Sequence, residues 1–164
     1  MPAPATKNNT SLAKIDDAKR LLAKITNVAD ARKMLALAEG LVTATSKEYK
    51  ASTVLPGAKE DRDHAYHTAL KAGELRLMAE ARLGELSSQQ IKHGGDRRSK
   101  NQGNINVTLK DIGLSKMDSQ RAQKVAAHQD LIPVVVAKAV ETSDIPTRKD
   151  MERATWAKFL FDKN

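Results

Sequence analysis

The sequence contains no cysteine and only five aromatic residues among its 164 residues. The absence of cysteine excludes disulfides, thiolate catalysis and cysteine-ligated zinc, and it fits a reducing compartment, so we expect a cytoplasmic protein. Because aromatic side chains are few, the core must consist of aliphatic residues, methionine and alanine, which favours packed helices over sheets. No apolar run approaches the length of a membrane span, so we expect no membrane association.

The sequence also lacks the residue patterns of common enzymes. It has no Gly-x-Ser-x-Gly elbow for a nucleophile and no Gly-x-x-x-x-Gly-Lys loop for a phosphate. His64 and His67 follow Glu60 and Asp61 by about one helical turn, a spacing that could present metal ligands, but two solvated histidines on a polar helix face are the simpler interpretation. We therefore expect a protein that is not an enzyme, with no catalytic residues, no bound metal and no cofactor.

Breaks in helical periodicity divide the chain into four segments. Residues 1–10 have no periodicity and are expected to be disordered. Residues 11–93 contain two amphipathic helices and then a long stretch, 59–93, without helix breakers. Residues 94–106 are rich in glycine and basic side chains and predict a flexible linker, whereas 107–162 return to short helices. The expected fold is all-α, with an N-terminal helical hairpin and long helix followed by a C-terminal helix-turn-helix bundle.

The long helix predicted over 59–93 carries many small residues among its apolar ones. Small residues allow helices to approach closely, so this face could pack either against the two preceding helices or against a second copy of the chain. We expect the region to support self-association as a homodimer or higher oligomer. The small residues are Ala65, Ala69, Ala72, Gly73, Ala79 and Gly84.

The net charge of +8 is concentrated in one part of the chain. Residues 92–124 carry eight basic and three acidic side chains, which is more than half of the excess in one fifth of the sequence. A surface that binds a phosphate backbone needs such a concentration, because each neutralised phosphate releases counterions. The alternative is a surface whose charge only keeps the protein soluble. We expect Arg97, Arg98 and Lys100 of the predicted linker to contact phosphates.

Two capping boxes follow this linker, seven residues apart. Thr108 with Asp111, and Ser115 with Asp118, each combine an N-cap hydroxyl with a carboxylate three residues later. Two helix starts so close together predict a short helix, a turn and a second helix, with Gly113 supplying a positive φ between them. Residues 108–127 therefore predict a helix-turn-helix.

Projecting the second of these helices at about 100° per residue separates an apolar face from a polar one. The face expected to be buried consists of Leu114, Met117, Ala122, Val125 and Ala126. In a helix-turn-helix the start of the second helix enters the major groove, so we expect base contacts from polar residues there. These residues are Lys116, Ser119, Gln120 and Gln123, and the further phosphate contacts are expected from Lys110, Arg121 and Lys124.

A third capping box, Thr147 with Asp150, predicts a last helix that contains Trp156 and Phe159. These aromatic side chains could stack on nucleic-acid bases, but a C-terminal aromatic cluster more commonly belongs to a core or a dimer contact. We expect them to pack.

The stretch 109–126, LKDIGLSKMDSQRAQKVA, resembles the helix-turn-helix of the ParB/KorB class of plasmid partition and regulatory proteins. Together with the segments AGELR (72–76), RLGEL (82–86) and GGDRRS (94–99), it is similar to a broad group of phage and mobile-element proteins. The resemblance implies a phage or plasmid DNA-binding protein, such as a transcriptional or partition-like regulator. The chain lacks the arginine-rich nucleotide-binding motif of ParB proteins, so the resemblance does not extend to a CTP-dependent clamp.

The expected partners are double-stranded DNA and further copies of the chain. A second hypothesis belongs to another class: a helical inhibitor or adaptor that uses its basic surface to bind a host protein or nucleoprotein complex, for example a defence system. The two hypotheses differ in what Gln120 and Gln123 contact.

Overall fold

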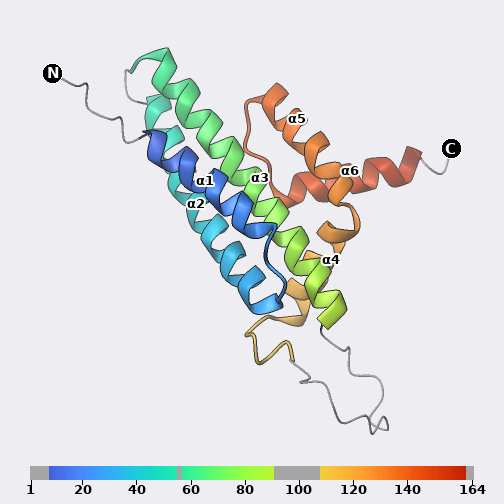
Figure 1. The fold of residues 1–164 in the computed structure, drawn as a ribbon. Coiled ribbons are helices and arrows are strands. Elements are labelled where there is room, and N and C mark those ends of the chain that lie inside the picture. Colours follow the sequence, from blue (N-terminus) through green and yellow to red (C-terminus); the bar gives the residue numbers. More distant parts are fainter. Residues whose placement is uncertain (1–7, 55–56, 91–107, 162–164) are drawn as a thin grey trace, which may run out of the picture.

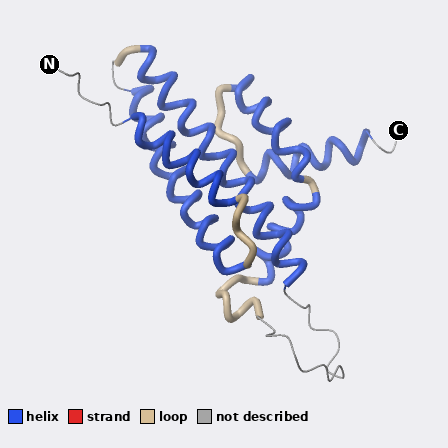
Figure 2. Tube along the Cα trace, viewed as in Figure 1, coloured by secondary structure: helices blue, strands red, loops and turns tan. Residues whose placement is uncertain are grey.

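The structure is a computed structural model that describes residues 8–54, 57–90 and 108–161. Within these ranges all regular structure is helical and no strand occurs, which confirms the all-α prediction (Figures 1 and 2). The first helix begins at Asn8, so its first turn lies inside the segment 1–10 that was expected to be disordered. The helices are α1 (Asn8–Leu22), α2 (Val28–Val54), α3 (Lys59–Gln90), α4 (Lys116–Ala127), α5 (Ile132–Thr142) and α6 (Arg148–Phe161), with a 3-10 turn at Gln129–Leu131.

Helix α3 lies at the centre of the molecule. It contacts α1 and α2 on one side and α4 and α5 on the other (Figure 1). Leu75 packs into an apolar cluster with α1 and α2, Leu77 into a cluster with α5 and α6, and Leu83 into a cluster with α2 and the start of α4. A helix that neighbours cover on several sides organises the described part of the fold around itself.

The small residues of α3 are used inside the chain. At Gly84 an added Cβ would overlap the backbone of Ala122 in α4, and at Gly73 it would come within 2.9 Å of the Pro146 ring. Helix α4 and the α5–α6 loop therefore approach α3 at distances that only glycine allows. Ala72 and Ala79 pack with the two preceding helices, which is one of the two possibilities that the sequence left open, whereas Gly73 and Gly84 meet later segments that neither possibility included.

The two parts predicted from the sequence, 11–93 and 107–162, share one apolar cluster. Val28 and Ala31 of α2 pack with Leu83 of α3 and with Leu114 and Ala122 from beyond the predicted linker. The linker itself, with Arg97, Arg98 and Lys100, lies outside the described residues. Hydrophobic burial thus joins α4 and the turn before it to the N-terminal helices.

A buried ion pair attaches α6 to α3. Glu80 of α3 is fully buried, and its Oε1 lies 2.5 Å from Nε of Arg148 in the first turn of α6. Arg76 adds a second cation, with Nη2 3.9 Å from the other carboxylate oxygen. Because both charges are largely removed from water, each depends on the other for compensation. The pair ties the first turn of α6 to α3.

The second half of α6 leaves the body of the protein (Figure 1). Met151 is buried in the cluster with α5, but Trp156 is 67% exposed and Phe161 is 83% exposed. Phe159 and Leu160 are also exposed. Trp156 and Phe159 therefore do not belong to a core of this chain, and the alternative expectation, a contact between copies, stays a prediction.

Candidate nucleic-acid interface

The turn that precedes α4 is fixed by local hydrogen bonds. The Thr108 amide and hydroxyl donate to the Asp111 carboxylate at 2.8 and 2.7 Å, which lowers the pKa of Asp111. One helical turn follows and ends with Gly113 at φ +59°, where the amide of Leu114 donates to Leu109 O at 2.8 Å and that of Gly113 to Lys110 O at 2.9 Å. This is a Schellman end, and the accompanying apolar contact comes from Leu109 and Leu114, which join the same cluster.

Helix α4 begins directly after this turn. The Ser115 hydroxyl accepts from the amide of Asp118 at 3.0 Å and donates to its carboxylate at 2.6 Å. Both predicted capping boxes are thus present, and so is the positive φ of Gly113. The structure has no helix over 108–112: residues 109–113 form a single hydrogen-bonded turn, so the short first helix predicted there is not found.

An arginine from α2 holds the turn in place. The guanidinium of Arg32 donates a hydrogen bond to the carbonyl of Ile112, and its Nη1 occupies the space where a Cβ at position 113 would lie. Sequence reasoning missed this contact, because 80 residues separate the two partners and no local pattern marks them. The position of α4 therefore depends on α2 as well as on α3.

The buried face of α4 differs from the predicted one. Ser119 is 1% exposed and packs against α3 with Ala122 and Val125. Gln123 is half-buried, and its Nε2 donates to the Ser119 hydroxyl at 3.3 Å and to Ser87 of α3 at 3.4 Å. The prediction that Ser119 lies on the polar face is wrong, because the close crossing at Gly84 admits only small side chains there.

The opposite face of α4 is exposed and mostly basic or polar. Met117, predicted to be buried, lies on this face and is 59% exposed. Arg121 Nη1 lies 3.7 Å from the Asp118 carboxylate, an exposed ion pair of small energetic weight. Lys110 on the preceding turn is exposed as well. We call the following residues the exposed face of α4: Lys116, Met117, Gln120, Arg121 and Lys124.

A groove separates the second half of α4 from α6. Its volume is about 490 Å³, and its lining includes Arg121, Lys124 and Trp156. The exposed face of α4 and the exposed part of α6 therefore border one hollow.

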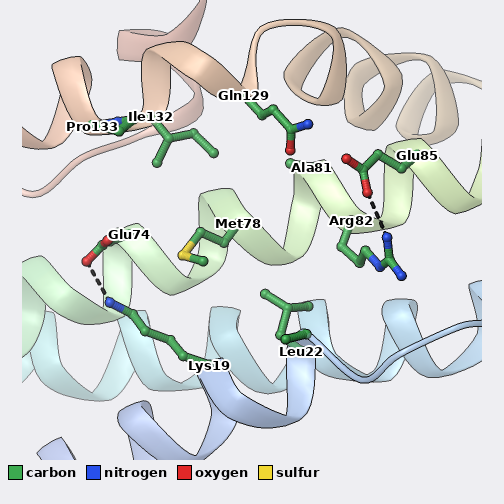
Figure 3. Close-up of a pocket in the computed structure, with 11 residues that line it drawn as sticks. Lys19, Leu22, Glu74, Met78, Ala81, Arg82, Glu85, Gln129, Ile132 and Pro133 are labelled. Carbon is green, nitrogen blue, oxygen red and sulfur yellow. Dashed lines mark hydrogen bonds and ion pairs between the residues drawn. The ribbon is translucent and has the colours of Figure 1, made fainter.

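A second groove lies on the other side of α3, where α1 and α5 meet it (Figure 3). Its volume is about 410 Å³, and Met78 and Ile132 give it an apolar lining. The charged groups that border it are already compensated, because Lys19 pairs with Glu74 at 2.7 Å and Arg82 with Glu85 at 2.9 Å. The Arg82 guanidinium also donates to the carbonyl of Ile25. This groove therefore presents less uncompensated charge than the exposed face of α4.

The chain matches no protein-family model, no curated protein and no solved structure. Within the described ranges, no cluster of three or more His, Asp or Glu residues could hold a metal ion. None of the described helices is both long and apolar enough to cross a membrane.

Proposed function

We propose that this protein binds double-stranded DNA by placing the exposed face of α4 in the major groove. The observation that carries the proposal is the way α4 is held. One face of α4 packs against α3, and both ends of the preceding turn are capped. The other face presents cations and the side-chain amide of Gln120 to solvent. This is the arrangement by which a helix-turn-helix presents its second helix to DNA.

The exposed residues divide into two roles. Gln120 lies in the first half of α4 on its exposed face, so its amide is the best candidate for a base edge, adenine in particular. Lys116 is placed for either a base or a phosphate, and Lys110, Arg121 and Lys124 extend the positive charge to both sides for phosphates. Ser119 and Gln123 support the helix from its buried side and are no longer assigned to bases.

The resemblance to partition and regulatory proteins supports the role of a DNA-binding regulator, without catalysis. Two copies of the chain would present two α4 helices to two half-sites, as helix-turn-helix dimers do. The small-residue face of α3 is already covered within the chain, so such a dimer would have to use another surface.

Fluorescence anisotropy with labelled duplex DNA across a salt series tests the proposal. The variant Lys116→Ala/Arg121→Ala/Lys124→Ala should lose affinity for all sequences, and the slope of log affinity against log salt should fall by about 2 to 3, since each phosphate contact contributes roughly 0.9. The matched control is Lys47→Ala/Lys50→Ala/Lys59→Ala, which removes the same charge from exposed residues at the α2–α3 end of the molecule.

An equal loss in the two triple variants would show that binding follows net charge alone and would contradict the assignment to α4. Undetectable binding of the unaltered protein at low salt, where nonspecific association is strongest, would refute DNA binding altogether.

Gln120 and Gln123 provide a finer test within one helix. Gln120→Ala should reduce the preference among sequences and leave both the salt slope and the melting temperature unchanged, because the side chain is exposed. Gln123→Ala should instead lower the melting temperature, because its amide bridges Ser119 and Ser87. A loss of sequence preference from Gln123→Ala without any change in stability would reverse these two roles.

A further inference from the structure

The α4–α6 groove combines cations with an exposed aromatic side chain. Arg121 and Lys124 line it from α4, Glu152 and Trp156 line it from α6, and His128 lies between the two helices in the sequence and also lines it. The groove thus continues the exposed face of α4 on the side toward α6, because Arg121 and Lys124 belong to both.

The charge of this groove favours an anion. Arg148 also lines it, but its guanidinium is engaged with buried Glu80, so the available cations are those of α4. Lys124 has no ion-pair partner within the described part of the chain, and Arg121 has only the exposed contact with Asp118. A second copy bound symmetrically across this groove would bring these cations toward one another, which opposes self-association here.

Trp156 is placed between two hollows. One is the α4–α6 groove, and the other, of about 320 Å³, is lined by Trp156, Phe159 and Thr155. The ring of Phe159 meets the indole edge-on, with centroids 6.1 Å apart and planes at 86°. An edge-to-face contact of this kind orients the indole without covering both of its faces.

We propose that the α4–α6 groove binds a DNA strand by its phosphates, at Arg121 and Lys124, and stacks one unpaired base on the indole of Trp156. The inference rests on the proposed DNA binding and adds a second contact to it. A positively charged groove that carries an aromatic side chain is the general means by which proteins bind unstacked nucleotides, since every base has a face that can stack. Duplex DNA on α4 would supply such a nucleotide at a frayed, gapped or distorted step.

Trp156 is the only tryptophan of the chain, so tryptophan fluorescence reports on the surroundings of this one indole. The full chain is titrated with three probes: a blunt duplex, the same duplex with a short thymidine overhang, and oligothymidine. We expect saturable quenching that is strongest with the overhang duplex. Trp156→Ala should weaken binding of the overhang duplex at least about fivefold, the factor expected from one stacked base, and change binding of the blunt duplex less than about twofold.

The matched control is Phe161→Ala, which removes another exposed aromatic side chain from α6 without touching the groove. It should leave the affinity for all three probes unchanged. Both variants should melt at the temperature of the unaltered protein, because both side chains are largely exposed.

Glu152 gives an independent test of the phosphate contact. Among the described residues that line the groove, Glu152 is the one with a carboxylate. Glu152→Gln removes the repulsion between this carboxylate and a bound phosphate, so it should tighten binding of the overhang duplex roughly two- to fivefold at low salt. An unchanged or weaker affinity in Glu152→Gln would contradict a phosphate in the groove.

Three outcomes would overturn the inference. If the blunt duplex binds and the tryptophan emission stays constant with every probe, the groove is not a nucleotide site, although DNA binding stands. If emission changes with protein concentration in the absence of DNA, the groove is a contact between copies. If no probe binds, the proposed function fails first and the inference fails with it.

Discussion

Helices α3 and α6 each carry a leucine in a different environment. Leu77 in α3 is fully buried, whereas Leu160 in α6 is 59% exposed. The difference follows from their neighbours. Helix α3 has small residues where other segments cross it, so neighbours pack on several of its sides, whereas the second half of α6 extends beyond the helices that cover Met151. Apolar residues thus hold the fold together in α3, whereas those in the second half of α6 stay largely exposed.

The largest change in the free energy of unfolding is expected at the ion pair between Glu80 of α3 and Arg148 of α6. Glu80→Gln leaves the guanidinium of Arg148 without its carboxylate in a mostly buried position, so the free energy of unfolding should fall by about 3–5 kcal/mol. Urea denaturation measures the change. Glu141→Gln, at an exposed position of α5, is the control and should change stability by less than about 0.5 kcal/mol. Similar values for the two variants would show that the pair does not hold α6 on α3.

The two leucines test the comparison directly. Leu77→Ala should lower the free energy of unfolding by about 2–5 kcal/mol, because it removes apolar contacts and leaves a cavity in the cluster with α5 and α6. The same change at Leu160 should cost less than about 0.5 kcal/mol. A large loss at Leu160 would mean that α6 is covered in solution, for example by another copy of the chain.

Glycine substitutions test how closely α4 crosses α3. In Gly84→Ala the new Cβ meets the backbone of Ala122, which cannot move aside easily, so we expect a loss of about 1–3 kcal/mol and a shift of α4. Gly40 in α2 has nothing within 4 Å of the corresponding position, so Gly40→Ala should stabilise the protein by about 0.5–1 kcal/mol through helix propensity. If both variants gain stability, α3 and α4 do not cross as closely as described.

The smallest effect is expected at the capped turn before α4. Because hydrogen bonds from Thr108 lower the pKa of Asp111, this group contributes stability that is present above the ordinary Asp pKa of about 4 and is lost as the pH falls below it. Asp111→Asn should therefore melt slightly below the unaltered protein at neutral pH, and the gap should close in acid. A gap that is constant with pH would show that the carboxylate charge is not involved.

Features set by neighbouring residues were predictable from the sequence. The capping boxes at Thr108, Ser115 and Thr147 and the positive φ of Gly113 all involve groups within three residues of each other, and all are present. The helices over 59–90 and 116–127 follow from the same local reasoning, apart from their end points.

Features set by distant residues were not predictable. The rotation of α4 that buries Ser119 and exposes Met117 depends on the crossing at Gly84, and hydrophobicity alone assigns those two residues to the opposite faces. The contact of Arg32 with Ile112 joins residues that are 80 positions apart in the sequence. A periodic pattern identifies the apolar side of a helix but does not reveal how close its neighbour comes.

The crossing of α3 and α4 at Gly84 also limits how the segment 108–127 can be used in protein engineering. Residues 108–127 share their core with α2 and α3, so we expect that a segment cut from this chain and grafted onto another scaffold would not keep its shape. Replacing only the exposed side chains of α4 leaves that core intact. Under the proposed function, a change of DNA specificity is best sought at Lys116, Gln120 and Arg121, with the rest of the chain kept as their support.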